Sequence, residues 1–154
     1  MARIRYTSAA LRRGRVSLGG QVYHVTSVTR SRIPVFADYR AAHAACRVFI
    51  DPRCLGKTRL LAWVLMPDHV HWLLQLGGGE DLDVVVARLK SASARKANAA
   101  LGRTAPLWER AYHDHAVRSE QTMEEIARYV VANPLRSGLV ERIGQYPYWN
   151  AVWL

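Results

Sequence analysis

The sequence has few cysteines, few lysines and no long hydrophobic run. Cys46 and Cys54 are the two cysteines among 154 residues, and they do not form a closely spaced zinc pair, which argues against structural zinc. The longest apolar run, residues 60–66, is far shorter than the roughly 20 residues of a membrane span. The N-terminus lacks the apolar core of a secretion signal. We therefore expect one domain with reduced cysteines in the cytoplasm, without a membrane partner.

Acidic residues are also scarce relative to basic ones. The chain has 22 Lys and Arg against 12 Asp and Glu, which gives a formal net charge of +10, and arginine supplies most of it. The planar guanidinium group suits phosphates and base edges. This excess predicts a polyanionic partner, and a solvated basic surface is the alternative.

Residues 1–19 are rich in arginine and show little periodicity. The segment ends at a glycine pair, so we interpret it as a basic arm and not as a packed element. Such an arm can become ordered on nucleic acid. The arginines expected to contact nucleic acid are Arg3, Arg5, Arg12, Arg13 and Arg15.

Residues 66–74, MPDHVHWLL, place two histidines in an apolar run. Residues 58–66 and 69–76 are typical of two strands joined by a tight turn, and their apolar composition predicts a central hairpin. Side chains alternate along a strand, so His69 and His71 point to the same face. Two imidazoles on one face can share a metal ion, or each can be buried with ordinary hydrogen-bond partners.

Other segments predict the remaining strands and helices. Residues 21–29 predict the first strand, whose His24 we interpret as structural, and residues 107–117 predict a bent strand. Helices are expected over residues 38–50 and 81–100. The second helix is amphipathic, and its outward basic residues, expected to follow a phosphate backbone, are Arg88, Lys90, Arg95 and Lys96.

A second pair, His113 and His115, has the same spacing near the end of the 107–117 strand. With Asp114 it forms a rival set of metal ligands. Asp114 would point to the opposite face of a regular strand, which weakens that set.

The last helix is expected to open at the capping box TMEE, residues 122–125, and to end at Pro134. Glu125, Tyr129 and Asn133 are spaced four apart, so they form a polar stripe beside the core stripe. Tyr129 either covers part of the core with its ring or reaches a site. The aromatic residues that follow either stack on bases or fill the core.

Three segments, residues 66–74, 108–118 and 129–140, together resemble the single-tyrosine HUH transposases, and in particular their REP-associated branch. The resemblance implies an α/β (α+β) fold, a ferredoxin-like antiparallel sheet of four or five strands with helices on one side. We divide the chain into the arm, a catalytic domain over residues 20–142 and an aromatic tail over residues 143–154.

The resemblance also implies roles. His69 and His71 match the metal-binding pair, Tyr129 matches the nucleophile, and Asn133 matches the third ligand, where mobile relatives often have glutamine. It implies a divalent cofactor, Mg²⁺ or Mn²⁺, and single-stranded DNA or hairpins of repetitive extragenic palindromes as the partner. Tyrosine attack would give a 5′-phosphotyrosine and a free 3′-hydroxyl. The resemblance favours a monomer over a dimer, acting near the bacterial nucleoid.

Two other functions fit the same residues. A non-catalytic DNA- or RNA-binding regulator would use the same basic surface. A small metallohydrolase would use both histidine pairs, with Tyr129 incidental.

Overall fold

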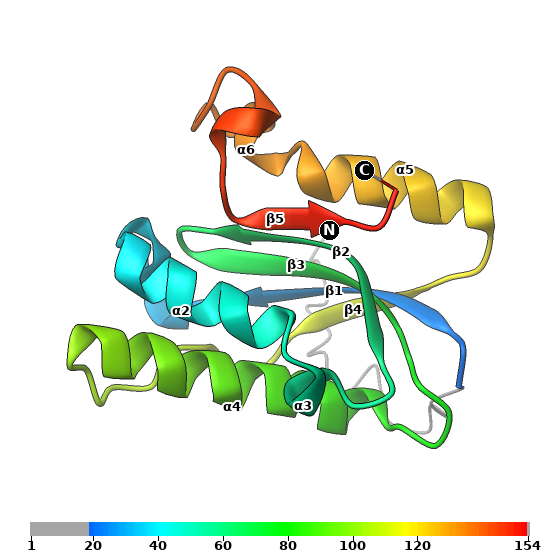
Figure 1. Cartoon of the computed structure of the whole chain (residues 1–154), viewed down its shortest axis with the longest axis horizontal. Helices are drawn as coiled ribbons and strands as arrows, with labels where there is room; N and C mark the ends of the chain where they lie inside the picture. The colour runs from blue at the N-terminus through cyan, green and yellow to red at the C-terminus, as the bar shows by residue number, and fades with distance from the viewer. Residues whose placement is uncertain (1–18, 154) are drawn as a thin grey trace, which may run out of the picture.

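The protein folds as a five-stranded antiparallel sheet with helices packed on it, which confirms the predicted fold class (Figure 1). The structure is a computed structural model that describes residues 19–153. The strand order is β4-β1-β3-β2-β5. The strands are β1 (Val22–Val28), β2 (Arg59–Met66), β3 (His69–Gln75), β4 (His113–Val117) and β5 (Trp149–Ala151).

β2 and β3 form the central hairpin that the sequence predicts. Met66 pairs with His69 across the two-residue turn. Trp72 and Leu73 point to opposite faces of β3, and both are fully buried. The near-continuous apolar composition of this hairpin is explained because both of its faces are covered.

Helices α2 (Tyr39–Phe49) and α4 (Leu82–Leu101) cover one face of the sheet, and the short α3 (Pro52–Leu55) follows α2. Their N-termini are capped, because the carboxylates of Asp38 and Asp81 each accept a hydrogen bond from a backbone N–H of the first turn. The phenylalanine and tryptophan side chains of this layer are Phe36, Phe49, Trp63, Trp72 and Trp108.

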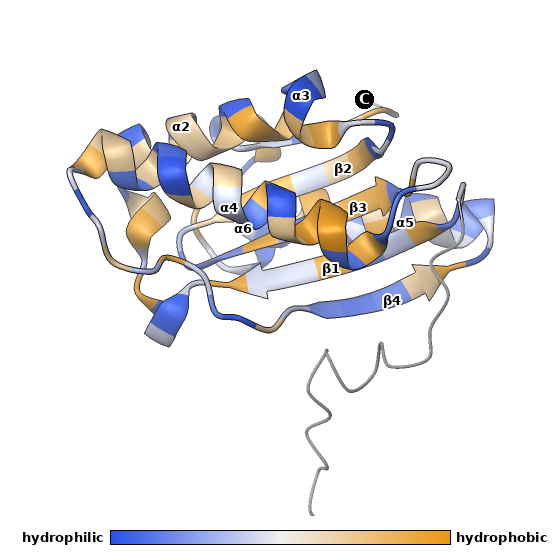
Figure 2. Cartoon of the chain, turned by 90° about the horizontal axis from the view of Figure 1, so that it is seen from below, coloured by the Kyte–Doolittle hydropathy of each residue, from blue (hydrophilic) through white to orange (hydrophobic). Residues whose placement is uncertain are grey.

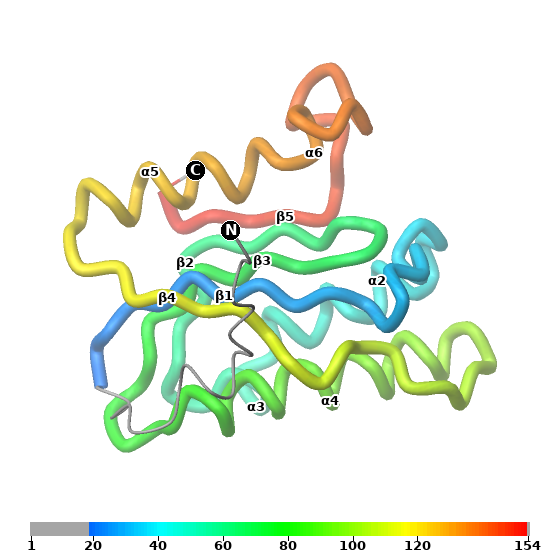
Figure 3. Tube along the Cα trace, turned by 180° about the vertical axis from the view of Figure 1, so that it is seen from behind, coloured from blue at the N-terminus to red at the C-terminus, as the bar shows by residue number. Residues whose placement is uncertain are grey.

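Helix α5 (Glu120–Val131) lies on the opposite face, as Figures 1 and 3 both show. Its Ala127 and Val131 belong to the same core cluster as Leu73 of β3. The expectation that the helices lie on one side of the sheet is therefore wrong. The apolar side chains on the second face of β2 and β3 need their own cover, and α5 provides it.

The bounds of α5 differ from the prediction. The helix begins at Glu120, because Ser119 is its N-cap and accepts a hydrogen bond from the Thr122 N–H. It ends at Val131, since Pro134 has no N–H to continue the ladder. A separate four-residue turn, α6 (Asn133–Arg136), follows, so Asn133 does not lie on α5 as the expected stripe requires.

The strand expected over residues 107–117 is regular only in β4. Ahead of it, Trp108 forms a single bridge to Thr29 and is buried in the α2–α4 layer, where its Nε1 donates to the Ser93 hydroxyl at 3.0 Å. Because the Trp108 indole is buried there, the residues ahead of β4 do not continue its strand pairing. Figure 2 shows that the first residues of β4 are hydrophilic, as expected for an edge strand.

The aromatic residues near the C-terminus are part of the sheet and not a separate tail. Trp149 pairs with Val64 of β2 in β5, and the Tyr146 hydroxyl donates to the Leu65 carbonyl at 2.5 Å. The structural interpretation of these aromatics is thus the one that the fold supports. Between residues 19 and 153, no helix combines the length and the apolar character needed to cross a membrane.

Substituting Tyr146→Phe should lower the free energy of unfolding by about 1–3 kcal/mol, because the Leu65 carbonyl loses its hydroxyl donor in a partly buried setting. Urea denaturation followed by circular dichroism measures this. Tyr148→Phe is the control, since the Tyr148 hydroxyl makes no hydrogen bond with any described residue, and it should stay within about 0.5 kcal/mol of the wild type. Equal losses in both variants would contradict the assignment.

Candidate active site

Four histidines from three adjacent strands form a row on the sheet face that α5 covers. Neighbouring ring centroids lie 5.1 Å apart from His69 to His71, 5.1 Å apart from His71 to His24 and 5.0 Å apart from His24 to His115. The strand pairing explains the row, because β1 lies between β3 and β4. We call these four residues the histidine row.

His69 lies at the start of β3 and is half-buried. Its Nδ1 is 2.7 Å from an oxygen of the Asp68 carboxylate. An ionised carboxylate can only accept a hydrogen bond, so Nδ1 is the donor. In the neutral ring, Nε2 then carries the free lone pair, which is the arrangement that a hydrogen-bonded carboxylate imposes on a metal-binding histidine.

His71 is buried, and its Nδ1 also has protein partners. This atom lies 3.0 Å from His24 Nε2 and 3.0 Å from Thr26 Oγ1. Burial, together with His24, His69 and Arg136, lowers the pKa of His71 to about 3, so the ring is neutral at neutral pH. Within the described residues, its Nε2 makes no hydrogen bond.

His24 also belongs to the candidate site, although the sequence alone favours a structural role for it. Burial, and then the neighbouring His115, lowers its pKa to about 4. Its contact with His71 depends on β1 pairing with β3. The alternation of residues 21–29 puts His24 and Thr26 on one face, but nothing local in the sequence specifies the strand that lies beside them.

Helix α5 brings Tyr129 to the histidine row. The Tyr129 ring meets His71 edge-on, with centroids 6.3 Å apart, and the side chain is 52% exposed. The guanidinium carbon of Arg136 lies 3.8 Å from the centroid of the same ring, and Arg136 Nη1 donates to the Tyr129 carbonyl at 2.7 Å. The phenol is therefore open to solvent while its ring contacts a buried histidine and a cation.

Within the described part of the chain, no three or more His, Cys, Asp or Glu side chains form a group suited to a metal ion. The rival set of His113, Asp114 and His115 is therefore not assembled. Asp114 lies opposite Val25 and alternates away from the two histidines, as a regular strand requires. A metal at His69 and His71 would need amide, phosphate or water oxygens to complete its coordination.

The family model described as "Transposase IS200 like" matches residues 18–133. The chain belongs to the IS200-like transposase family. Curated relatives include an inferred REP-associated tyrosine transposase of Haemophilus influenzae, 28% identical over 98 residues that cover 57% of this chain and 56% of the relative. Another is the REP-associated tyrosine transposase of Escherichia coli K12, 24% identical over 56% of this chain and 50% of the relative. The chain thus spans about half the length of these relatives.

Solved structures confirm the fold of this member of the IS200-like family. A REP-associated tyrosine transposase bound to a REP hairpin superposes with a TM-score of 0.68 at 23% identity, over 88% of this chain and 79% of the other. An inferred transposase from Deinococcus radiodurans R1 superposes with a TM-score of 0.56 at 28% identity, over 76% and 93% of the two chains. The family resemblance predicted from the three sequence segments is confirmed.

Asn133 lies in α6, beyond the end of the helix that carries Tyr129. The residue is half-buried, and its side-chain amide makes no hydrogen bond with any residue in 19–153. The structure thus joins Tyr129 to the histidine row without a polar contact from Asn133. Its role as the third ligand stays a prediction.

Two of the basic residues expected to face outward on α4 are half-buried and bond neighbouring segments. Arg88 donates to the Cys54 carbonyl and pairs with Glu80 at 3.3 Å. Lys90 Nζ donates to the Glu109 carbonyl at 2.6 Å. Both long side chains fold back to bond carbonyls of adjacent segments, so they are only partly exposed, and their contact with nucleic acid stays a prediction.

Arg95 and Lys96 are exposed, as predicted, and line an open groove of about 1040 Å³ between α2 and α4. Arg40 and Arg53 also line it, each held by an N-cap carboxylate. Arg47, Arg95 and Lys96 make no hydrogen bond or ion pair with any described residue. The basic residues of this α2–α4 groove are Arg40, Arg47, Arg53, Arg95 and Lys96. The arginines expected in the basic arm, Arg3, Arg5, Arg12, Arg13 and Arg15, lie outside the described residues.

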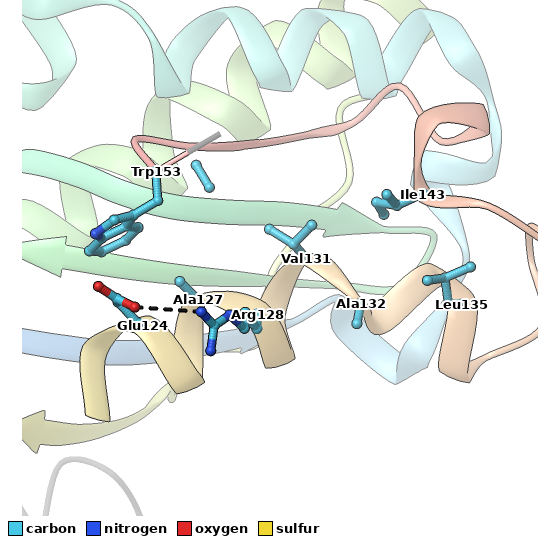
Figure 4. Close-up of a pocket in the computed structure, with 9 residues that line it drawn as sticks. Glu124, Ala127, Arg128, Val131, Ala132, Leu135, Ile143 and Trp153 are labelled. Carbon is cyan, nitrogen blue, oxygen red and sulfur yellow. Dashed lines mark ion pairs between the residues drawn. The ribbon is translucent and has the colours of Figure 1, made fainter. Parts of the chain in front are cut away.

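A smaller apolar cavity of about 240 Å³ lies beside α5 (Figure 4). It is lined by Ala127 and Val131 of the helix and by Trp153 near the C-terminus. Glu124 and Arg128, one helical turn apart, form an ion pair at 3.5 Å beside it. None of its lining residues belongs to the histidine row, so the cavity is separate from the candidate active site.

Proposed function

We propose that this chain is a metal-dependent endonuclease and transposase that cleaves and rejoins single-stranded DNA through Tyr129. The observation that carries the proposal is the contact between the Tyr129 ring and His71, which joins an exposed phenol to a histidine pair on the central strand. Membership of the IS200-like family supports it. Palindromic hairpins are the proposed substrate, since one similar fold is that of a REP-associated transposase bound to a REP hairpin.

The proposed reaction is a transesterification. Tyr129 Oη attacks the phosphorus and loses its proton, while the bond from phosphorus to the 3′ oxygen breaks and that oxygen gains a proton. The products are a 5′-phosphotyrosine and a free 3′-hydroxyl. Because the phosphodiester is kept as an ester of the protein, another 3′-hydroxyl can reverse the step without ATP.

His69 and His71 are the residues that would hold the divalent ion, with Asn133 as the proposed third ligand. The donor set fits, because each ring uses Nδ1 for a protein partner and leaves Nε2 free, and because His71 is neutral. When bound, the ion supplies Lewis-acid stabilisation of the charge that develops on the phosphate. Of the two candidate ions, Mn²⁺ suits two imidazoles better than Mg²⁺, which prefers oxygen ligands.

The α2–α4 groove is the proposed contact for the DNA backbone. Three of its basic residues, Arg47, Arg95 and Lys96, make no hydrogen bond or ion pair with a described residue, so each can neutralise a phosphate.

Tyr129→Phe should abolish covalent adduct formation with a single-stranded hairpin oligonucleotide in the presence of Mn²⁺ or Mg²⁺, because the ring is kept and the nucleophilic oxygen is removed. Hairpin affinity should change by less than about threefold, which is under about 0.7 kcal/mol. A denaturing gel detects the adduct, and Tyr148→Phe is the matched control. An adduct formed by Tyr129→Phe would contradict the assignment of Tyr129 as the nucleophile. Hairpin binding by the wild type without any adduct would favour the non-catalytic regulator.

His69→Ala and His71→Ala should each lose adduct formation and calorimetric Mn²⁺ binding, because one imidazole and solvent hold the ion weakly. Hairpin binding should persist. His113→Ala is the comparison, since this exposed histidine of β4 has no assigned contact with the row. Loss of Mn²⁺ binding in His113→Ala alone would instead favour the rival ligand set.

The three groove charges can be reversed by changing Arg47, Arg95 and Lys96 to Glu. This variant should bind the hairpin at least 100-fold more weakly, and the slope of log K against log salt should fall in magnitude by about 2–3. The control reverses three exposed charges outside the groove, Lys57, Arg59 and Arg118. Fluorescence anisotropy over a salt series measures both proteins. Equal losses would mean that net charge alone, and not the groove, attracts the DNA.

A further inference from the structure

The turn after α5 folds Arg136 back onto the helix that carries Tyr129. Pro134 interrupts the helix, and the backbone N–H groups of Leu135 and Arg136 both bond the Ala132 carbonyl. This tight turn lets the Arg136 side chain reach the carbonyl of Tyr129, seven residues earlier, at 2.7 Å. Arg136 is therefore anchored to the backbone of the proposed nucleophile itself.

The same guanidinium lies over the face of the Tyr129 ring. Its central carbon is 3.8 Å from the ring centroid, well within the roughly 6 Å range of a cation–π contact. One N–H group of five is used by the Tyr129 carbonyl, and the others make no hydrogen bond with a described residue. Arg136 is exposed, so these donors are available to a ligand.

The Tyr129 ring lies between Arg136 and the histidine row, because Arg136 lies over its face and His71 meets it edge-on. One cation thus lies beside the phenol, on the helix that faces the proposed metal pair. This is the region where negative charge develops when a phosphodiester is attacked, and fixed cations there favour the transition state over the ground state.

We propose that Arg136 holds the Tyr129 ring in its attacking orientation and offers its free N–H groups to a non-bridging oxygen of the scissile phosphate. A guanidinium suits this task because its planar fork stacks on an aromatic ring and binds phosphate through parallel hydrogen bonds. The inference rests on the proposed tyrosine chemistry. It adds Arg136, which the four-residue spacing around Tyr129 does not include. Arg136 lies beyond the end of the helix on which that spacing was expected.

The test compares Arg136→Gln with Arg128→Gln, in which an exposed arginine one residue before Tyr129 is changed without touching its ring. Single-turnover adduct formation at saturating hairpin should fall about 100-fold in Arg136→Gln, with hairpin affinity and melting temperature nearly unchanged. Arg136→Lys should recover only part of the rate, because it keeps the charge and loses the fork. Millimolar guanidinium ion should partly restore the rate of Arg136→Ala, which a purely structural role would not allow.

A second readout needs neither metal nor DNA. In nuclear magnetic resonance spectra, the side-chain protons of Arg136 should be shifted upfield by the Tyr129 ring, and Tyr129→Leu should remove that shift. If Arg136→Gln forms adduct at the wild-type rate while Tyr129→Phe forms none, the inference is wrong and the proposed function stands. If the wild type forms no adduct, the proposed function fails, and absence of the upfield shift would separately overturn the ring contact.

Discussion

Burial of β3 on both faces is the constraint on which the site depends. Trp72 packs into the layer of α2 and α4, whereas Leu73, on the other face, needs a second cover. Helix α5 is that cover, and its buried residues fix its rotation about its own axis. With Ala127, Val130 and Val131 turned to the sheet, Tyr129 is left at the flank of the helix, next to His71. The contact that joins the two halves of the site is thus a by-product of core packing.

Features that depend on local periodicity follow from the sequence. The hairpin over β2 and β3, the shared face of His69 and His71 and the helices α2 and α4 all match their predictions, because strand alternation and helical periodicity are set by neighbouring residues. Tyr129 could be singled out only through the family resemblance. Nothing within its own helix distinguishes it from a tyrosine that covers the core.

Features that depend on distant segments do not follow. His24 contacts His71 only because β1 pairs with β3. Trp149 lies in a strand only because it pairs with the edge of β2. Arg88 and Lys90 have the spacing of an outward helix face, yet the charged groups of both donate hydrogen bonds to carbonyls of other segments. Amphipathic spacing shows which side of a helix faces away from the core, but it does not show what else lies there.

The two faces of the sheet divide the work proposed for this protein. The α2–α4 groove lies on one face and Tyr129 on the other, so DNA that engages both must pass around an edge or an end of the sheet. Duplex DNA resists bending over distances far longer than a small domain, whereas a single strand turns freely. A junction between a stem and a flexible strand fits this path, and an unbroken duplex does not. The protein would then select flexible DNA over stiff duplex DNA before any side chain recognises a base.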